Sequence, residues 1–398
     1  MLSAEELVLI ILIGAIVAIA ARRLRIPYTV GLVVAGIVLA ALPFKPEISL
    51  SKDLLFNLLL PPLIFEAAIH IRWRELKVDL LPITVYATVG VLLAGAVTAA
   101  VMHFVIGWEW GAAVIFGVLI AATDPVSVIA TFKEAGVEGR LRLLVEAESL
   151  FNDGTAAVAF SVALMLAMGQ QVGVASTALA VTWSIGGGIL CGLVVGGIAV
   201  LFIGTTKDHL VELSMTTLAA FGSFWLSEHF HLSGILATTA AGLLVGNVRV
   251  MTEKGEEYIE NFWDFAAFVV NSVVFVILGM NVAYQSFARL VLTTLVAIVA
   301  VVLGRAVAVY PCSALFGRTS RRITKEHQHI LFWGGLRGAL ALALALGIPD
   351  SLPYRQEILT VTFGVVAFSV FVQGMTITPL LKRLGQLPKA TGSSPGRL

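Results

Sequence analysis

Charged residues are scarce in this chain. Asp, Glu, Lys and Arg make up 13% of its 398 residues, and hydrophobic residues make up 58%; soluble domains have about 25% and about 45–50%, respectively. Apolar runs long enough to cross a hydrocarbon core of about 30 Å recur along the whole sequence. Little sequence is left for a soluble domain, so the composition predicts an integral membrane protein built of spanning helices.

Other absences narrow the functional class. The sequence contains no G-x-x-x-x-G-K-[ST] phosphate loop, which argues against an ATP-driven pump. It also contains no Gly-Asp dipeptide, the signature expected of an intramembrane aspartyl protease. The net charge of +1 does not indicate a nucleic-acid partner. We assign the two cysteines, Cys191 and Cys312, to helix packing and not to a disulfide or a metal site.

Proline, glycine and charged residues divide the chain into thirteen candidate spans. The second and ninth spans are short, and the first, from Glu5, is expected to be a retained helix because no small-residue cleavage pattern follows it. The spans are centred near Ile13, Gly36, Leu60, Leu93, Leu119, Ala159, Leu193, Ala219, Ala241, Val270, Val299, Ala339 and Phe368.

The Lys and Arg residues are distributed unequally between the two sides of these spans. Of the 26, two lie inside spans (Arg305 and Arg337), and 20 of the others fall on one side. Only four fall on the other side: Lys45, Lys52, Arg289 and Arg355. Because cytoplasmic loops are rich in Lys and Arg, this pattern predicts an N-terminus outside the cell and a C-terminus in the cytoplasm.

Two spans are interrupted, the fifth at "AATDPVSV" and the twelfth at "WGGLRGAL". If spans one to six and eight to thirteen are repeats, the interrupted spans occupy corresponding positions and run in opposite directions. The fold class predicted is therefore an all-α polytopic membrane protein of about thirteen transmembrane helices, with inverted repeats of six. Paired broken helices in inverted halves indicate a binding site near the membrane midplane.

The break in the fifth span contains Thr123, Asp124 and Pro125. Proline cannot donate a backbone hydrogen bond, so carbonyls before it are released from the helix. Freed carbonyls beside a carboxylate form a site for a hard cation. The alternative is a proline kink in which Asp124 only caps the second half-helix.

The sixth span, "LLVEAESLFNDGTAAVAF", carries Glu148 and Asp153 into the membrane. Each charge at the centre of a span costs about 2.5–3.5 kcal/mol, so these acids need a partner, a proton or water. Ser149 lies four residues before Asp153, on the same helix face, and can add a hydroxyl ligand. Asn152 directly precedes Asp153.

The remaining intramembrane charges offer partners for these acids. Arg305, in the eleventh span, lies at a depth comparable with Glu148 and is its preferred ion-pair partner; Arg337 is the alternative. Glycines around Arg337 allow the twelfth span to unwind, and we expect its guanidinium to neutralise the carbonyl ends of half-helices. Glu66, in "LLPPLIFEAA", is either a buried acid bonded to backbone or a group near the ion.

Exchange follows from competition at one carboxylate. If a cation and a proton compete for Asp153, the empty ionised site is unfavourable at the midplane, and crossing is cheapest when either one neutralises it. A mobile core (residues 80–168 and 289–383) moving past a scaffold (residues 5–70 and 179–280) would give alternating access. Residues 384–398 are expected to form a short cytoplasmic tail. Gly188, Gly192 and Gly196 are assigned to helix packing, within or between subunits.

The segments "AATDPVSV", "ESLFNDGTAAV", "WGGLRGALALALAL" and "LLPPLIFEAA", set among thirteen spans, resemble the monovalent cation/proton antiporter family. The similarity is to the branch of NhaP-type prokaryotic antiporters and animal sodium/proton exchangers. It implies a secondary transporter, not an enzyme, that exchanges Na⁺ or Li⁺ for H⁺ in the plasma membrane without a cofactor. It also implies a lipid-embedded homodimer and an elevator-like motion of the core. K⁺/H⁺ exchange and, less favoured, a cation channel remain alternatives.

The same resemblance implies roles for individual residues. Asp153 would bind either Na⁺ or H⁺, and Asp124, the Thr123 carbonyl and Ser149 would complete or support the ion site. Asn152 matches the Asn of the electroneutral branch, which implies one-for-one exchange. The further roles implied are an ion pair between Glu148 and Arg305, an approach of Glu66 to the ion from the scaffold, and a match of Arg337 to the family's Gly-Gly-Leu-Arg-Gly segment.

Overall fold

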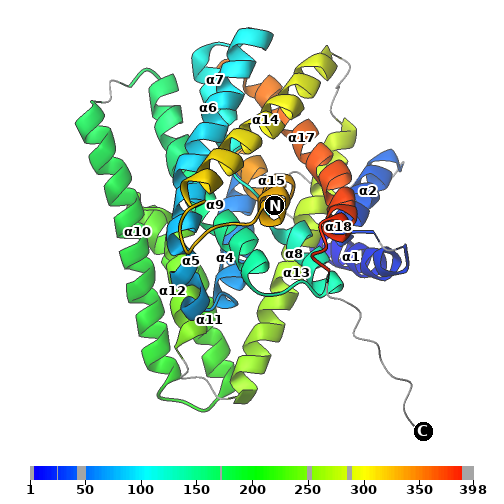
Figure 1. The fold of residues 1–398 in the computed structure, drawn as a ribbon. Helices are drawn as coiled ribbons and strands as arrows, with labels where there is room; N and C mark the ends of the chain where they lie inside the picture. Colours follow the sequence, from blue (N-terminus) through cyan, green and yellow to red (C-terminus); the bar gives the residue numbers. More distant parts are fainter. Residues whose placement is uncertain are drawn as a thin grey trace.

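The computed structural model describes residues 4–24, 26–42, 51–170, 173–248, 253–284 and 289–387. These residues form helices and connections, with no strand among them, which confirms the all-α prediction. Within the described ranges, thirteen helical segments correspond to the thirteen predicted spans (Figure 1). Eight are long and apolar enough to cross a membrane, and α2 (Tyr28–Ala41), α7 (Trp110–Leu119) and α12 (Gly234–Asn247) are shorter apolar helices.

Several segments contain a π-helical turn or a break. The other elements of the first six segments are α1 (Ala4–Leu24), α3 (Lys52–Leu54), η1 (Leu55–Leu59), α4 (Leu60–Ile69), α5 (Trp73–Val85), η2 (Tyr86–Gly90), α6 (Val91–Val101), η3 (Met102–Ile106), α8 (Val126–Ala135) and α9 (Arg140–Ala167). The last seven comprise α12 and α10 (Val174–Ile203), α11 (His209–His229), α13 (Glu253–Tyr284), α14 (Val291–Leu315), α15 (Lys325–Trp333), α16 (Ala339–Leu346), α17 (Arg355–Phe368), η5 (Ser369–Gln373) and α18 (Gly374–Arg383).

The two predicted breaks are present, and they meet. The chain leaves helical geometry between α7 and α8 and again between α15 and α16. The backbone N–H of Asp124 in the first break donates to the carbonyl of Leu336 in the second, over 2.8 Å. A backbone group freed by one interruption is thus paired by the other, which satisfies the requirement that polar backbone at membrane depth be bonded within the protein.

The helices pack in two groups. In one, α6 lies against α7 and α14, and α7 lies against α9. In the other, α2 packs on α13, while α4, α10 and α11 pack on α12. Figure 1 shows α10, α11 and α12 together along one side of the molecule.

The glycine spacing in α10 serves packing inside one chain. A methyl group on Gly192 would collide with the carbonyl of Ala237 in α12, and one on Gly188 would lie 2.7 Å from the carbonyl of Ser233. Small residues allow this close approach of two backbones. Of the two alternatives left open by the sequence, the structure therefore supports packing within a subunit.

Some residues used to predict orientation and the tail lie outside the described ranges. These are Arg25, Lys45, Arg249, Lys389 and Arg397, and the predicted tail is described only as far as residue 387.

Candidate functional site

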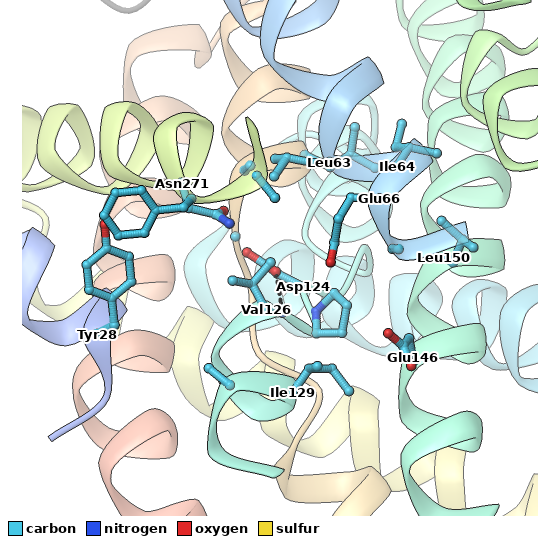
Figure 2. A pocket seen from close by; sticks show the side chains of 18 of the residues that line it. Tyr28, Leu63, Ile64, Glu66, Asp124, Val126, Ile129, Glu146, Leu150 and Asn271 are labelled. Atoms are coloured by element: carbon cyan, nitrogen blue, oxygen red, sulfur yellow. Dashed lines mark hydrogen bonds between the residues drawn. The ribbon is translucent and has the colours of Figure 1, made fainter. Parts of the chain in front are cut away.

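A cavity of about 420 Å³ lies beside the first break. Asp124 of the break, Asp153 of α9 and Glu66 of α4 all line it, and it extends to Lys133 of α8 and Asp264 of α13. Figure 2 shows the carboxylates of Glu66 and Asp124 directed toward the same space. The fold therefore brings together acids from three predicted spans.

Asp124 is held in place by both half-helices around it. Its Oδ1 accepts a hydrogen bond of 2.9 Å from the N–H of Val126, in the first turn of α8. A methyl group on Gly338, at the start of α16, would collide with the Asp124 carboxyl group. One oxygen thus pairs with the first free N–H of α8 while the residue also lines the cavity, so a helix-end role and a cavity role for Asp124 are compatible.

Asp153 has a different environment. It lines the cavity from α9, and its Oδ1 is buried with no hydrogen-bond partner among the described residues. An ionised carboxylate with one buried, unpaired oxygen is costly. Binding of a proton or a cation at this group removes that cost.

The side chains of Thr123, Ser149 and Asn152 connect the break to α9. Thr123 Oγ1 lies 3.0 Å from Ser149 Oγ, and Asn152 Nδ2 donates to Thr123 Oγ1 over 3.3 Å. Asn152 Nδ2 also lies 3.2 Å from Glu148 Oε1. Thr123 lines the cavity, whereas Ser149 and Asn152 are buried and are not among the described lining residues. Their contacts fix the position of the break.

Glu148 and Arg305 form a bidentate ion pair in the protein interior. Arg305 Nη1 and Nη2 donate to Glu148 Oε1 and Oε2 over 2.8 and 2.9 Å. The two residues are 1% and 6% exposed, respectively. Arg305 also donates to the carbonyl of Leu331, one of the last four of α15, so the pair ties α9 and α14 to the end of a half-helix.

Arg337 does not take the place of Arg305. It is buried in the second break, and its Nη1 lies 3.4 Å from each of the carbonyl oxygens of Ala121 and Ala122. These carbonyls directly follow the C-terminal end of α7, where a helix presents partial negative charge. The Arg337 guanidinium therefore lies beside the end of a half-helix.

Two half-exposed lining residues of the cavity, Lys133 and Asp264, carry charges that the sequence reasoning did not assign to the site. Lys133 Nζ of α8 lies 3.6 Å from Asp264 Oδ1 of α13. His70 Nδ1 lies 3.7 Å from Glu66 Oε1, and Glu66, His70 and Asp264 have ligand atoms within 4.8 Å of one another. These oxygens could attract a cation to the mouth of the cavity, where Lys133 opposes it.

Asn271 is a further cavity residue that the sequence reasoning missed. It lines the cavity from α13 and is buried. The available signal was a single amide inside the apolar run "AAFVVNSVVFVILGM". Polar groups inside spans tend to face a protein interior or a water-filled space.

Comparison with known proteins identifies Na⁺/H⁺ exchangers and antiporters as relatives of this chain. The family model described as "Sodium/hydrogen exchanger, transmembrane" matches residues 8–383. The Na⁺/H⁺ antiporter ApNhaP of Aphanothece halophytica is 38% identical over 367 residues, which cover 91% of this chain and 70% of the relative. The Na⁺/H⁺ antiporter NhaH of Halobacillus aidingensis is 31% identical over 396 residues, covering 96% and 97%.

Solved structures of the sodium proton antiporter MjNhaP1 from Methanocaldococcus jannaschii share the fold. The structure at pH 8 superposes with a TM-score of 0.74 at 21% identity, covering 96% of each chain. The structure from an electron-microscopy map gives a TM-score of 0.77 at 22% identity, covering 99% of this chain and 98% of the other.

Proposed function

Because the chain belongs to the family of transmembrane sodium/hydrogen exchangers, we propose that it exchanges Na⁺ for H⁺ across the membrane. Membership of this family makes it a multi-pass membrane transporter and not an enzyme. The observation that carries the proposal is the convergence of Asp124 and Asp153, from two separate spans, on one cavity beside two crossed helix breaks.

In the proposed mechanism, Asp153 binds one ion at a time. A proton or a Na⁺ neutralises its carboxylate, and the empty ionised form does not cross the membrane because its desolvation is costly. Asp124 and the Thr123 carbonyl supply further oxygens to Na⁺. Ser149 and Asn152 support Thr123 through the hydrogen bonds described above. Competition at one site then couples the two fluxes.

Glu66 is proposed to meet the ion from the scaffold side, since it lines the cavity from α4. The ion pair of Glu148 and Arg305, together with Arg337, is proposed to hold the breaks in shape. One-for-one exchange is proposed because Asn152 has no carboxyl group. An aspartate at this position could bind and release a second proton in each cycle, and an asparagine cannot. Li⁺ is proposed as a second substrate, and K⁺ is an alternative.

The proposed orientation places the mouth of the cavity in the cytoplasm. The cavity reaches Lys133 and Asp264, each about half exposed, and Lys133 belongs to the side that carries most of the Lys and Arg residues. The described conformation would then be open to the cytoplasm, with the N-terminus outside and the C-terminus inside the plasma membrane.

Alternating access is proposed to come from movement of the core (residues 80–168 and 289–383) against the scaffold (residues 5–70 and 179–280). The packing of α6, α7, α9 and α14 in one group, and of α2 on α13 and α10 on α12 in the other, supports this division. A homodimer through the scaffold is also proposed. The apolar side chains that α10 exposes, which include Leu179, Trp183 and Leu190, would face lipid or the partner subunit.

The test uses purified protein in liposomes that hold a pH gradient and contain a pH-sensitive dye. NaCl or LiCl is expected to dissipate the gradient and choline chloride is not, and Asp153→Asn is expected to abolish the response because its side chain binds neither ion as a carboxylate does. Because protons compete with Na⁺, the apparent KM for Na⁺ should fall as pH rises until Asp153 is fully ionised. A KM that is constant across this range would contradict competition.

Potassium and current measurements separate the alternatives. Activity with KCl but not NaCl would preserve the mechanism and change the substrate. A sustained membrane current during Na⁺-driven turnover would argue against one-for-one exchange. Cation flux without coupled proton movement would support a channel.

A further inference from the structure

Asn271 presents an unused polar group to the cavity. The residue is 7% exposed, and its Oδ1 is buried with no hydrogen-bond partner among the described residues. Figure 2 shows its amide directed across the cavity toward Asp124, with Glu66 on the neighbouring wall. A buried amide oxygen without a partner costs about 1–3 kcal/mol, so its position calls for a functional explanation.

The position of this amide is fixed by the packing of α13. The next residue, Ser272, hydrogen-bonds to the hydroxyl of Tyr28 in α2 over 2.5 Å, and Tyr28 stacks on Phe268 with ring centroids 5.2 Å apart. One helical turn farther along, α2 and α13 cross closely: a methyl group on Gly36 would collide with the carbonyl of Val276. The wall that carries Asn271 is therefore rigidly attached to α2.

The chemistry of an amide suits a monovalent cation. Its carbonyl oxygen is a hard, neutral ligand of the kind that alkali and alkaline-earth ions accept, and its NH₂ group can donate to a carboxylate. Rotation of the terminal amide by 180° directs either group into the cavity. The same side chain can thus pair with Asp124 when no cation is bound and coordinate a cation when one arrives.

We propose that Asn271 is a cation ligand supplied by the scaffold wall to the ion held by Asp153 and Asp124. This inference rests on the exchange of Na⁺ for H⁺ proposed above. Asn271 and the two aspartates lie on helices of different packing groups, α13 in one and the segments around α7 and α9 in the other. When the core moves, the aspartates leave Asn271 behind. The amide therefore strengthens cation binding only in the conformation described here.

A one-sided ligand predicts a one-sided kinetic effect. Asn271→Leu keeps a similar side-chain size and removes the amide. It is expected to raise the apparent KM for Na⁺ about tenfold on the membrane face to which the cavity opens, and to change KM on the opposite face less than twofold. Asn271→Asp adds a carboxylate and is expected to lower KM on the open face at alkaline pH.

The experiment measures ²²Na⁺ exchange in everted and right-side-out vesicles from cells that lack other Na⁺/H⁺ antiporters. Asn281→Leu is the matched control. Asn281 lies on the same helix, is not among the described residues that line the cavity, and donates to the carbonyl of Ile277 over 2.9 Å. Its removal is expected to leave KM unchanged on both faces.

The outcomes are distinct. An inactive wild type would refute the proposed exchange itself. If the wild type is active, an Asn271→Leu variant with unchanged KM, or with KM raised equally on both faces, would overturn the ligand role. If Asn271→Leu does not reach the membrane, the near-isosteric Asn271→Asp decides: a lower KM on the open face alone supports the inference, and any other KM pattern overturns it.

Discussion

The buried pair of Glu148 and Arg305 leads to a quantitative stability prediction. Glu148→Gln keeps the shape of the side chain and removes its charge, which leaves the Arg305 guanidinium buried with only the Leu331 carbonyl and a neutral amide as partners. Loss of one member of a buried pair costs about 3–5 kcal/mol. The chain has 398 residues, so the unfolding entropy, at about 2.1 cal/mol/K per residue, amounts to about 0.8 kcal/mol/K.

Dividing these values predicts that the apparent Tm falls by about 4–6 °C. The assay is a thermal melt in detergent followed by the fluorescence of the seven tryptophans. Glu75→Gln is the control because Glu75 pairs with Arg72 at 3.8 Å on the surface, where ion pairs contribute about 0–1 kcal/mol.

A double variant tests whether the effect belongs to the pair. Glu148→Gln combined with Arg305→Met removes both charges, so the loss of stability is expected to be smaller than the sum of the two single losses by at least about 1 kcal/mol. The reasoning is refuted if the apparent Tm of Glu148→Gln equals that of the wild type, which is the result expected for the surface control Glu75→Gln. It is equally refuted if the two single losses add fully in the double variant.

Two other predictions concern the break and the mouth of the cavity. Gly338→Ala is expected to reduce exchange more than tenfold in the liposome assay, because its methyl group would displace Asp124. The control is Gly186→Ala, which should leave the rate unchanged because no neighbouring atom lies within 4 Å of the added carbon. Equal rates for the two variants would refute the steric argument. In the variant with Lys133→Cys and Asp264→Cys, a bis-methanethiosulfonate cross-link that spans the length of the original side chains is expected to stop exchange until a reductant is added. Full activity in the cross-linked form would show that α8 and α13 do not separate during transport.

Much of the fold could be predicted from the sequence because lipid leaves few choices. A backbone inside a bilayer must bond to itself, so apolar length and the positions of proline and glycine locate spans and breaks. The breaks at "AATDPVSV" and "WGGLRGAL" could be predicted from the sequence for this reason. The intramembrane acids Asp124, Glu148 and Asp153 stood out because each would be costly without a function or a partner.

The sequence could not choose between partners that are far apart along the chain. Arg305 and Arg337 both satisfied the need of Glu148 for a cation, and 157 positions separate Glu148 from the arginine that pairs with it. The glycine spacing of α10 was compatible with contacts inside or between subunits. Each choice depends on how whole helices cross, which local patterns do not encode.

By itself, then, the sequence determined that this protein is helical, spans the membrane many times, has two interrupted spans and carries carboxylates within the membrane. These features can be read from the sequence because removing polar and charged groups from water costs free energy, which restricts where they occur in a span. The tertiary structure decided which groups share one space. It placed Asn271 opposite Asp124, joined Glu148 to Arg305 and set Arg337 at the end of α7. A cavity wall is made by several helices at once, and close packing between them fixes which side chains can reach it.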